Sequence, residues 1–185
     1  MPLSESHPRK PIHLRRIECH GYRRDDGLWD IEAHLVDTKS YVWSNGWRGD
    51  VEPGVPVHEM WVRLTIDDEF TVRDAEAASD YVPFRPCPEA AAQFTRLKGL
   101  KIGAGWRRKL KEMFGGNQNC THLVELLGPL ATTAFQTIYP FREREEGALN
   151  AKGARIKPVI IDTCHALRSD GEVVKRYWPE FYTGA

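Results

Sequence analysis

Apolar and polar residues alternate along several stretches in the first half of the chain, which is the pattern of strands that bury one face. Two such stretches lie within residues 17–37, on either side of the turn sequence Arg24-Asp25-Asp26-Gly27, and two more lie within residues 57–74. The alternation therefore predicts two antiparallel hairpins. On the second strand the apolar positions are Trp29, Ile31, Ala33 and Leu35.

A helical period replaces the alternation in the middle of the chain. Apolar residues recur there every three or four positions, as one stripe of a long helix: Leu123, Leu126, Leu127, Leu130, Ala131, Ala134, Phe135 and Ile138. Gly128-Pro129 is expected to kink or break this helix, because proline cannot donate to the carbonyl four residues earlier. Shorter helices are predicted over residues 88–98 and 106–114, and a third hairpin over residues 159–178, around Ser169-Asp170-Gly171.

Together these elements predict an α+β fold, in which an antiparallel sheet built from three hairpins carries a helical layer on one side. The 185 residues suit one domain of ordinary size, so we expect a single domain over residues 1–185. Residues 1–12 are polar and contain proline, and residues 141–158 are charged and contain glycine. We expect a flexible tail from the first segment and a mobile loop from the second.

The charge balance excludes several kinds of partner. Lys plus Arg and Asp plus Glu each total 26, so no excess of either sign predicts binding to nucleic acid or to a membrane surface. Local basic pairs such as Arg15-Arg16 have acidic neighbours and indicate solvated surface. No apolar run approaches the ~18 residues of a membrane span, and the first residues lack a secretion signal. Four widely spaced cysteines favour reduced thiols, so we expect a cytoplasmic protein, with a homodimer left open.

The candidate chemistry centres on the start of the predicted long helix. Cys120, His122 and Glu125 lie within about two turns of its N-terminus, where the helix dipole lowers the pKa of a nearby thiol. A thiolate serves either as a nucleophile or as a metal ligand. The ligands of a zinc or iron ion converge from different elements, and His58 and Cys87 are the best partners for Cys120 in such a site.

Other residues could complete this site or act in its place. His122, Glu59 or Glu125 would be a fourth ligand or a neighbouring base. Two alternatives stay open: a nucleophilic pair of Cys120 with a histidine, or acid–base chemistry from ionisable residues on the hairpins, which are Asp30, Glu32, His34, His58 and Glu59. Cysteines that merely pack in the core would account for the same residues without any reaction.

Aromatic residues mark a second candidate feature. Trp43 and Trp47 stand at the start of a stretch rich in glycine and proline, residues 46–56. Tryptophans on a surface loop are unusual, since large apolar side chains gain free energy by leaving water. We therefore expect both to pack over something, such as a bound ligand.

Part of the chain resembles the NifU/IscU-type iron–sulfur scaffold. The resemblance is carried by residues 58–67 (HEMWVRLTID) and their return strand, by Cys87 before a helix and by Cys120 at the start of a long helix. His58 stands where the scaffold has an aspartate and Asn119 where it has a histidine, while the scaffold's first cysteine has no counterpart in residues 54–57. The resemblance implies a related core fold and a mononuclear metal site, with cluster assembly in doubt.

A second resemblance covers nearly the whole chain. Residues 23–33 (RRDDGLWDIEA), 37–39 (DTK), 120–123 (CTHL) and 162–166 (DTCHA) are similar to a bacterial domain-of-unknown-function family, the one numbered 2889. This resemblance points to bacteria that degrade lignin-derived aromatics. Some relatives are implied to be γ-formaldehyde lyases, which release formaldehyde from phenylcoumaran-type dimers and leave a stilbene.

The resemblance thus implies a carbon–carbon lyase with a small aromatic substrate. In this interpretation His58, Cys87 and Cys120 hold a divalent metal, zinc or iron, and His122, Glu59 or Glu125 supplies the base. The side chains that would stack on the substrate rings are Trp29, Tyr41, Trp43, Trp47 and Trp61. The alternative is a metal or iron–sulfur binding module that catalyses nothing.

Overall fold

The computed structural model describes residues 3–146 and 156–185. The chain divides into two compact units, Met1–Phe141 and Arg142–Ala185, and each unit is described by itself. Residues 3–12, the predicted tail, are exposed and carry no helix or strand. Of the predicted loop at 141–158, residues 141–146 are helical and residues 147–155 lie outside the described part of the chain.

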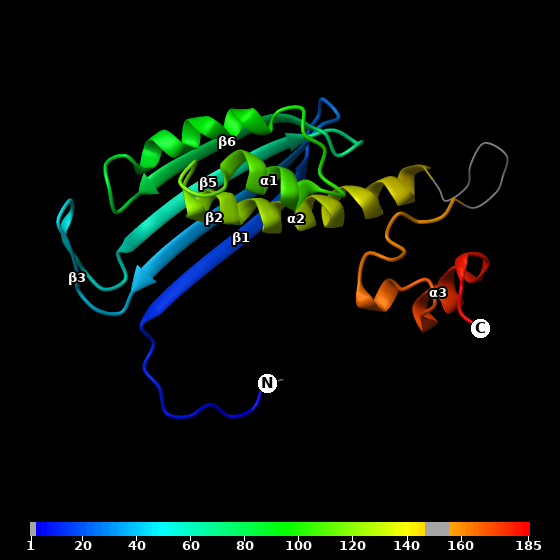
Figure 1. The fold of residues 1–185 in the computed structure, drawn as a ribbon, viewed down its shortest axis with the longest axis horizontal. Coiled ribbons are helices and arrows are strands. Elements are labelled where there is room, and N and C mark those ends of the chain that lie inside the picture. Colours follow the sequence, from blue (N-terminus) through cyan, green and yellow to red (C-terminus); the bar gives the residue numbers. More distant parts are fainter. Residues whose placement is uncertain (1–2, 147–155) are drawn as a thin grey trace. The chain divides into compact units, whose positions relative to one another are not determined.

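The first unit is built on a four-stranded antiparallel sheet (Figure 1). Its strands are β1 (His13–Arg23), β2 (Trp29–Lys39), β5 (Pro56–Ile66) and β6 (Val72–Tyr81), in the order β1-β2-β5-β6. Both predicted hairpins are therefore confirmed. The stretch predicted as a Gly/Pro-rich loop contains a small hairpin of its own, made of β3 (Trp43–Asn45) and β4 (Gly49–Val51).

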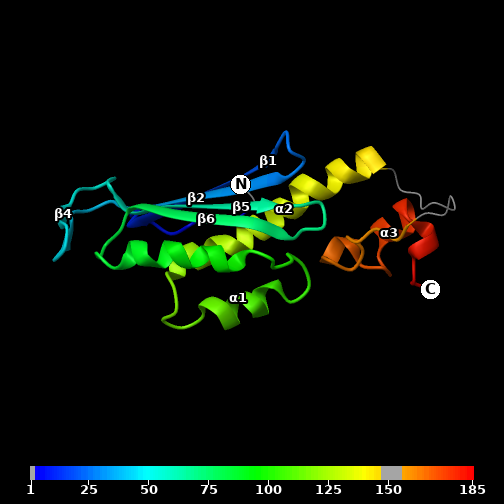
Figure 2. The same cartoon turned by 90° about the horizontal axis from the view of Figure 1, so that it is seen from above.

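The helices of this unit all cover the same face of the sheet, as predicted (Figure 2). They are a 3₁₀ helix, η1 (Cys87–Leu97), and two α-helices, α1 (Trp106–Phe114) and α2 (Thr121–Glu146). The inner face of the sheet and the predicted stripe of α2 are buried against each other. The alternating apolar residues of the strands and the helically spaced apolar residues of α2 therefore form the two sides of one core. No helix in the described part of the chain is long and apolar enough to cross a membrane.

Helix α2 continues through Gly128 and Pro129, where a kink or break was expected. Proline removes one backbone hydrogen bond there, but the flanking Leu127 and Leu130 are fully buried. Each buried leucine stabilises the fold by roughly 1.5–3 kcal/mol, which is comparable to the cost of an interior proline. Tertiary packing therefore keeps the helix in one piece.

The predicted third hairpin is wrong. Residues 159–178 of the second unit contain η2 (His165–Leu167) and α3 (Glu172–Tyr177), followed by η3 (Pro179–Phe181). Gly171, expected in a hairpin turn, instead precedes the first residue of α3. An isolated two-stranded hairpin is marginal in water, and α3 buries Val174 completely without one.

Gly21 lets α2 approach the sheet closely. A Cβ at this position would collide with the hydroxyl of Thr137, whereas a Cβ at Gly46 would meet nothing within 4 Å. We expect Gly21→Ala to lower the free energy of unfolding by about 1–3 kcal/mol, measured by urea denaturation, because the collision must push the helix outward. Gly46→Ala should be neutral, and Thr137→Ala should rescue part of the loss. Equal stabilities for the two glycine variants would contradict this packing.

Candidate functional site

Polar side chains replace apolar ones at one end of the inner face of the sheet. Arg15 of β1 and His58 of β5 both pair in register with Asp37 of β2, and all three point toward the helices, as the apolar residues of these strands do. The first turns of α2 bring His122 and Glu125 to the same place. We call Arg15, Asp37, His58 and His122 the polar cluster.

Asp37 is the centre of the polar cluster, and its side chain is only 2% exposed. Arg15 donates to both of its oxygens, from Nε to Oδ1 and from Nη2 to Oδ2, each over 2.8 Å. His13 Nε2 lies 3.2 Å from Oδ1, and His58 Nδ1 lies 3.1 Å from Oδ2. The buried negative charge is therefore compensated by a bidentate guanidinium, and two imidazoles lie within hydrogen-bonding distance of the carboxylate.

The two histidines of the cluster stack on each other. The ring centroids of His58 and His122 are 3.9 Å apart, and His122 Nε2 lies 3.9 Å from Asp37 Oδ2. One ligand atom from each of Asp37, His58 and His122 lies within 4.8 Å of the other two, so this group could hold a metal ion. Two imidazoles and one carboxylate are a common ligand set for mononuclear zinc and iron centres that leave positions open for a substrate.

The charge states of the cluster follow from burial and from neighbouring charges. Burial alone would raise the pKa of the Asp37 carboxyl, but the hydrogen bonds and the charge of Arg15 outweigh it and hold that pKa below its usual value. Burial, and then the charge of His122, lower the pKa of His58 to about 4. Burial and Arg15 also lower the pKa of His122. At neutral pH the aspartate is therefore ionised and both imidazoles are neutral, which are the forms that bind metals.

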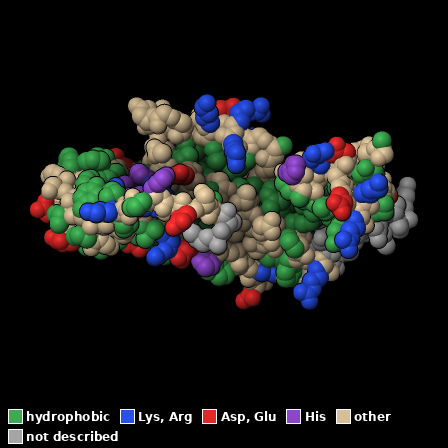
Figure 3. Space-filling view, turned by 90° about the horizontal axis from the view of Figure 1, so that it is seen from below, with side chains coloured by type: hydrophobic (Ala, Val, Ile, Leu, Met, Phe, Trp, Pro, Cys, Tyr) green, Lys and Arg blue, Asp and Glu red, His purple; other side chains and the backbone are tan. Residues whose placement is uncertain are grey.

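The cluster opens into a pocket of about 450 Å³. Cationic side chains, the two cysteines and an apolar wall line this pocket together with the cluster: His13, Arg15, Asp37, Lys39, Trp43, Val57, His58, Met60, Pro83, Phe84, Cys87, Cys120 and His122. Histidine side chains reach the surface beside acidic ones near the end of the sheet that carries the β3–β4 hairpin (Figure 3). The pocket is thus large enough for a small organic molecule and joins an apolar wall to charged groups.

The structure brings the predicted metal ligands to one pocket. His58, Cys87 and Cys120 all line it, and so does His122. Cys120 Sγ lies 3.9 Å from His122 Nδ1, at the N-terminal end of α2. The three-residue group that could hold a metal contains His58 and His122 but neither cysteine, and its third member is Asp37.

The other two predicted bases lie in different places. Glu125 accepts a hydrogen bond from Arg15 and has a side chain 53% exposed, so it lies beside the cluster. Glu59 follows His58 in β5 and points to the opposite face of the sheet, because side chains alternate along a strand. There it lies 3.0 Å from His34 Nε2, away from the pocket.

The five aromatic residues predicted to stack on a substrate do not lie together in the first unit. Trp43 lines the pocket, and Phe84 joins it there. Trp47 is 57% exposed and lines a neighbouring depression, which shares Phe84 and both cysteines with the pocket. Tyr41 is also exposed, but it does not line the pocket. Trp29 is 2% exposed and belongs to the core at the other end of β2.

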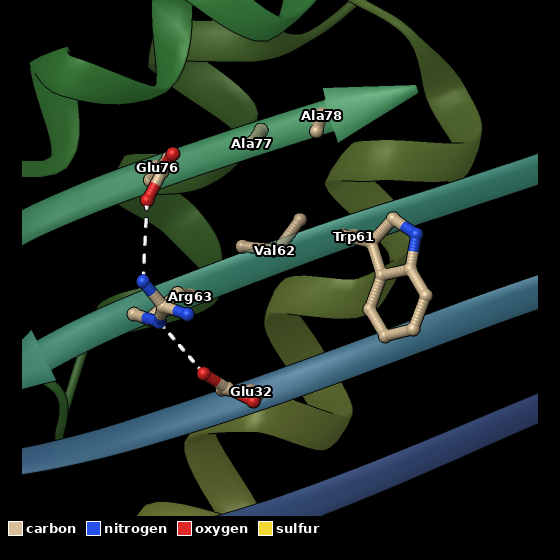
Figure 4. Close-up of a pocket in the computed structure, with 7 residues that line it drawn as sticks. All are labelled: Glu32, Trp61, Val62, Arg63, Glu76, Ala77 and Ala78. Carbon is tan, nitrogen blue, oxygen red and sulfur yellow. Dashed lines mark hydrogen bonds and ion pairs between the residues drawn. The ribbon is translucent and has the colours of Figure 1, made fainter. Parts of the chain in front are cut away.

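Trp61 lies on the outer face of the sheet, which the helices leave uncovered. Its ring stacks on His34 with centroids 3.6 Å apart, and it borders a shallow depression on that face (Figure 4). In this depression Arg63 bridges Glu32 of β2 and Glu76 of β6, as the dashed lines show. Trp61 therefore cannot contact a ligand in the pocket on the inner face.

The sequence analysis missed Asp37, His13 and Arg15. Asp37 continues the odd-numbered positions of β2 whose earlier members are apolar, so strand parity alone places this carboxylate on the buried face. Arg15 has the same parity as Ile17 and Cys19, which pack against the core, although Arg15-Arg16 looked like solvated surface. The cluster could have been predicted from an acidic residue at a core-facing position of one strand and an arginine at a core-facing position of the neighbouring strand.

Comparisons with known proteins identify a family. Residues 13–136, which include every member of the polar cluster, match the family described as "Protein of unknown function (DUF2889)". No curated protein and no solved structure matches the chain.

The depressed pKa of His58 makes folding stability depend on pH. An unfolded chain binds a proton at this histidine near pH 6.5, whereas the folded chain does so only near pH 4. Stability should therefore fall as pH falls through this window, by about 2 kcal/mol between pH 7 and 5. His122, whose pKa is also lowered, adds to this decrease. Asp37 adds little, since its stabilisation is lost only as pH falls through the usual carboxyl range and below it.

Urea denaturation of the chain with a chelator present measures this dependence. His58→Gln keeps a hydrogen-bonding side chain that does not titrate, so the variant should lose most of the decrease between pH 7 and 5. His20→Gln, on the outer side of β1, is the matched control and should keep it. An unchanged slope in His58→Gln would show that another group titrates.

Proposed function

Because the chain belongs to the DUF2889 family, whose description assigns no activity, we propose a function from its site: a metal-dependent lyase that acts on a phenolic aromatic dimer. The observation that carries this proposal is the convergence of Asp37, His58 and His122 within 4.8 Å in a pocket with an apolar wall. Such a site combines a Lewis acid with room for a small organic substrate.

In this proposal Asp37, His58 and His122 hold a divalent metal, zinc or iron. Both imidazoles are neutral at pH 7, so no proton competes strongly for their ring nitrogens. Arg15 occupies one lone pair on each Asp37 oxygen, and a metal bound at Oδ2 would replace the contact that His58 Nδ1 makes there. Arg15 then holds the ligating carboxylate in place, as groups behind metal ligands commonly do.

The pocket supplies contacts for an aromatic substrate. Trp43 and Phe84 offer ring faces at its wall, in place of the five aromatic residues predicted from the sequence. Phenolate oxygens are hard anionic donors that suit a divalent cation, and Lys39 adds positive charge to the pocket. A phenolic dimer would therefore place its ionised oxygen near the metal and its rings against the wall.

The proposed reaction releases formaldehyde from a phenylcoumaran-type dimer. Ionisation of the para-phenol expels the ether oxygen of the dihydrofuran ring, which opens to a quinone methide and a second phenolate. Removal of the γ-hydroxyl proton then breaks the carbon–carbon bond, formaldehyde leaves, and the bonding electrons restore the aromatic ring and form the stilbene double bond. Glu125 is the remaining candidate base, because a hydrogen bond from Arg15 holds it beside the cluster.

The second candidate function is a metal or iron–sulfur binding module on a NifU/IscU-like core. Cys87 and Cys120 in the pocket favour it, since iron–sulfur clusters are held mainly by thiolates. The carboxylate and two imidazoles that converge most closely favour a mononuclear centre instead. Ligand variants separate the two functions.

Elemental analysis of the purified chain should find about one equivalent of zinc or iron. His58→Ala and His122→Ala should each weaken metal binding by more than about 100-fold. Even mutation of a residue that only hydrogen-bonds to a metal ligand commonly lowers metal affinity by about 10–100-fold. Glu59→Gln is the matched control, because Glu59 neighbours His58 but faces the other side of the sheet. Loss of the metal in Cys87→Ser with its retention in His122→Ala would overturn the ligand set.

The activity itself is tested with a phenolic phenylcoumaran and the metal-loaded chain, measuring formaldehyde and stilbene together. We expect the two products in equal amounts, and a reduction of kcat by at least about 100-fold in His58→Ala. A substrate with its para-phenol methylated should not react, because it cannot form the quinone methide. Equal turnover of the methylated substrate, or none of the phenolic one by the metal-loaded chain, would refute the lyase.

A further inference from the structure

The two edges of the sheet differ. At the β6 edge, residues 99–102 cover the start of the strand: Val72 donates to the carbonyl of Leu100 and accepts from the N–H of Gly99, each over 2.8 Å. The ladder between β5 and β6 is also interrupted by two register shifts. The β1 edge shows neither feature, since β1 pairs with β2 over its whole length without a shift and has no second strand neighbour among the described residues.

An open edge of this length is a template for another strand, because within the described part of the chain no strand pairs with the outer N–H and C=O groups of residues 13–22. Proteins usually blunt such edges with bulges, prolines or charges. Strand β1 has no bulge or proline, and its outer side carries large apolar side chains as well as two charged ones. Leu14 is 54% exposed and Tyr22 is 49% exposed, and Ile12, which precedes the strand, is 56% exposed. Between them on the same side lie Arg16 and Glu18.

We infer that β1 pairs antiparallel with β1 of a second copy of this chain, with Ile17 opposite Ile17 on the two-fold axis. The pairing joins the two sheets edge to edge into one continuous sheet. A two-fold axis perpendicular to that sheet keeps both inner faces, with their helices, on the same side. The inference rests on the edge and the outer face of β1 and not on the proposed metal site, although His13 and Arg15 on the inner face of β1 line the pocket.

The side chains on the outer face select this register. An axis on Arg16 places two arginines opposite each other, and an axis on Glu18 does the same with two glutamates, so both registers are penalised by like charges. An axis on Cys19 sets the exposed Leu14 against Arg24, and Ile12 against Asp26. An axis on Ile17 avoids all of these conflicts.

With Ile17 on the axis, each outer side chain meets a suitable partner. Arg16 faces Glu18 of the second copy, and the same ion pair forms again across the axis. Leu14 faces His20, which stacks on Tyr22 at 6.2 Å, and Ile12 faces Tyr22 itself. The exposed apolar groups are therefore covered by apolar or aromatic groups, and each charge is met by its opposite.

Reversing charges on β1 tests the pairing in solution. Arg16→Glu sets acidic groups against each other at both positions, and Glu18→Arg sets basic groups against each other. Each variant should dimerise about tenfold more weakly or worse than the wild type, since cross-strand pairs contribute roughly 0.2–1 kcal/mol each and their reversal adds repulsion. The double variant Arg16→Glu/Glu18→Arg restores opposite charges and should dimerise like the wild type.

Mixing the two single variants is the most decisive experiment. In the heterodimer both pairs between positions 16 and 18 join opposite charges, whereas in each homodimer both pairs join like charges. Sedimentation velocity of the full chain measures the outcome, with twice the 21.2 kDa of one chain expected for the wild type and for the mixture. Arg63→Glu changes the net charge equally on a central strand and is the control that should stay dimeric. A monomeric wild type, a mixture that stays monomeric, or single variants as dimeric as the wild type would each overturn the pairing.

Discussion

The first unit depends on the compensation of one buried charge. Asp37 lies at an apolar position of β2 and is almost completely out of water, so its carboxylate would be strongly destabilising without partners. Arg15 meets both oxygens in a bidentate pair, and His13 and His58 lie within hydrogen-bonding distance. This compensation fixes the ends of β1, β2 and β5 relative to one another and shapes one side of the pocket.

The same interaction prepares the site for chemistry. A carboxylate kept ionised by Arg15 and two imidazoles kept neutral by burial are ready to bind a cation without first losing protons. The N-terminal turns of α2 stack His122 on His58, and they bring Cys120 beside His122. The structural role of Asp37 and its proposed role as a metal ligand therefore involve the same neighbouring residues.

The sequence patterns predicted the core residues, which recur at regular intervals along each element, and missed the single polar residues of the site, which follow no such period. The alternation of Trp29, Ile31, Ala33 and Leu35 and the stripe of α2 predicted the core, because burial imposes a period on each element. Asp37 escaped attention although it has the parity of those residues, since an acidic residue at a strand end is usually solvated. The second unit was predicted least well, because the residues taken for a hairpin turn directly precede α3 instead.

X-ray absorption spectroscopy of the metal-loaded chain tests the central claim most directly, that Asp37, His58 and His122 bind the metal. This ligand set predicts a first shell of nitrogen and oxygen only, at about 2.0–2.1 Å for zinc, with the outer-shell scattering of two imidazoles. A sulfur contribution at about 2.3 Å would place Cys87 or Cys120 on the metal and contradict the account.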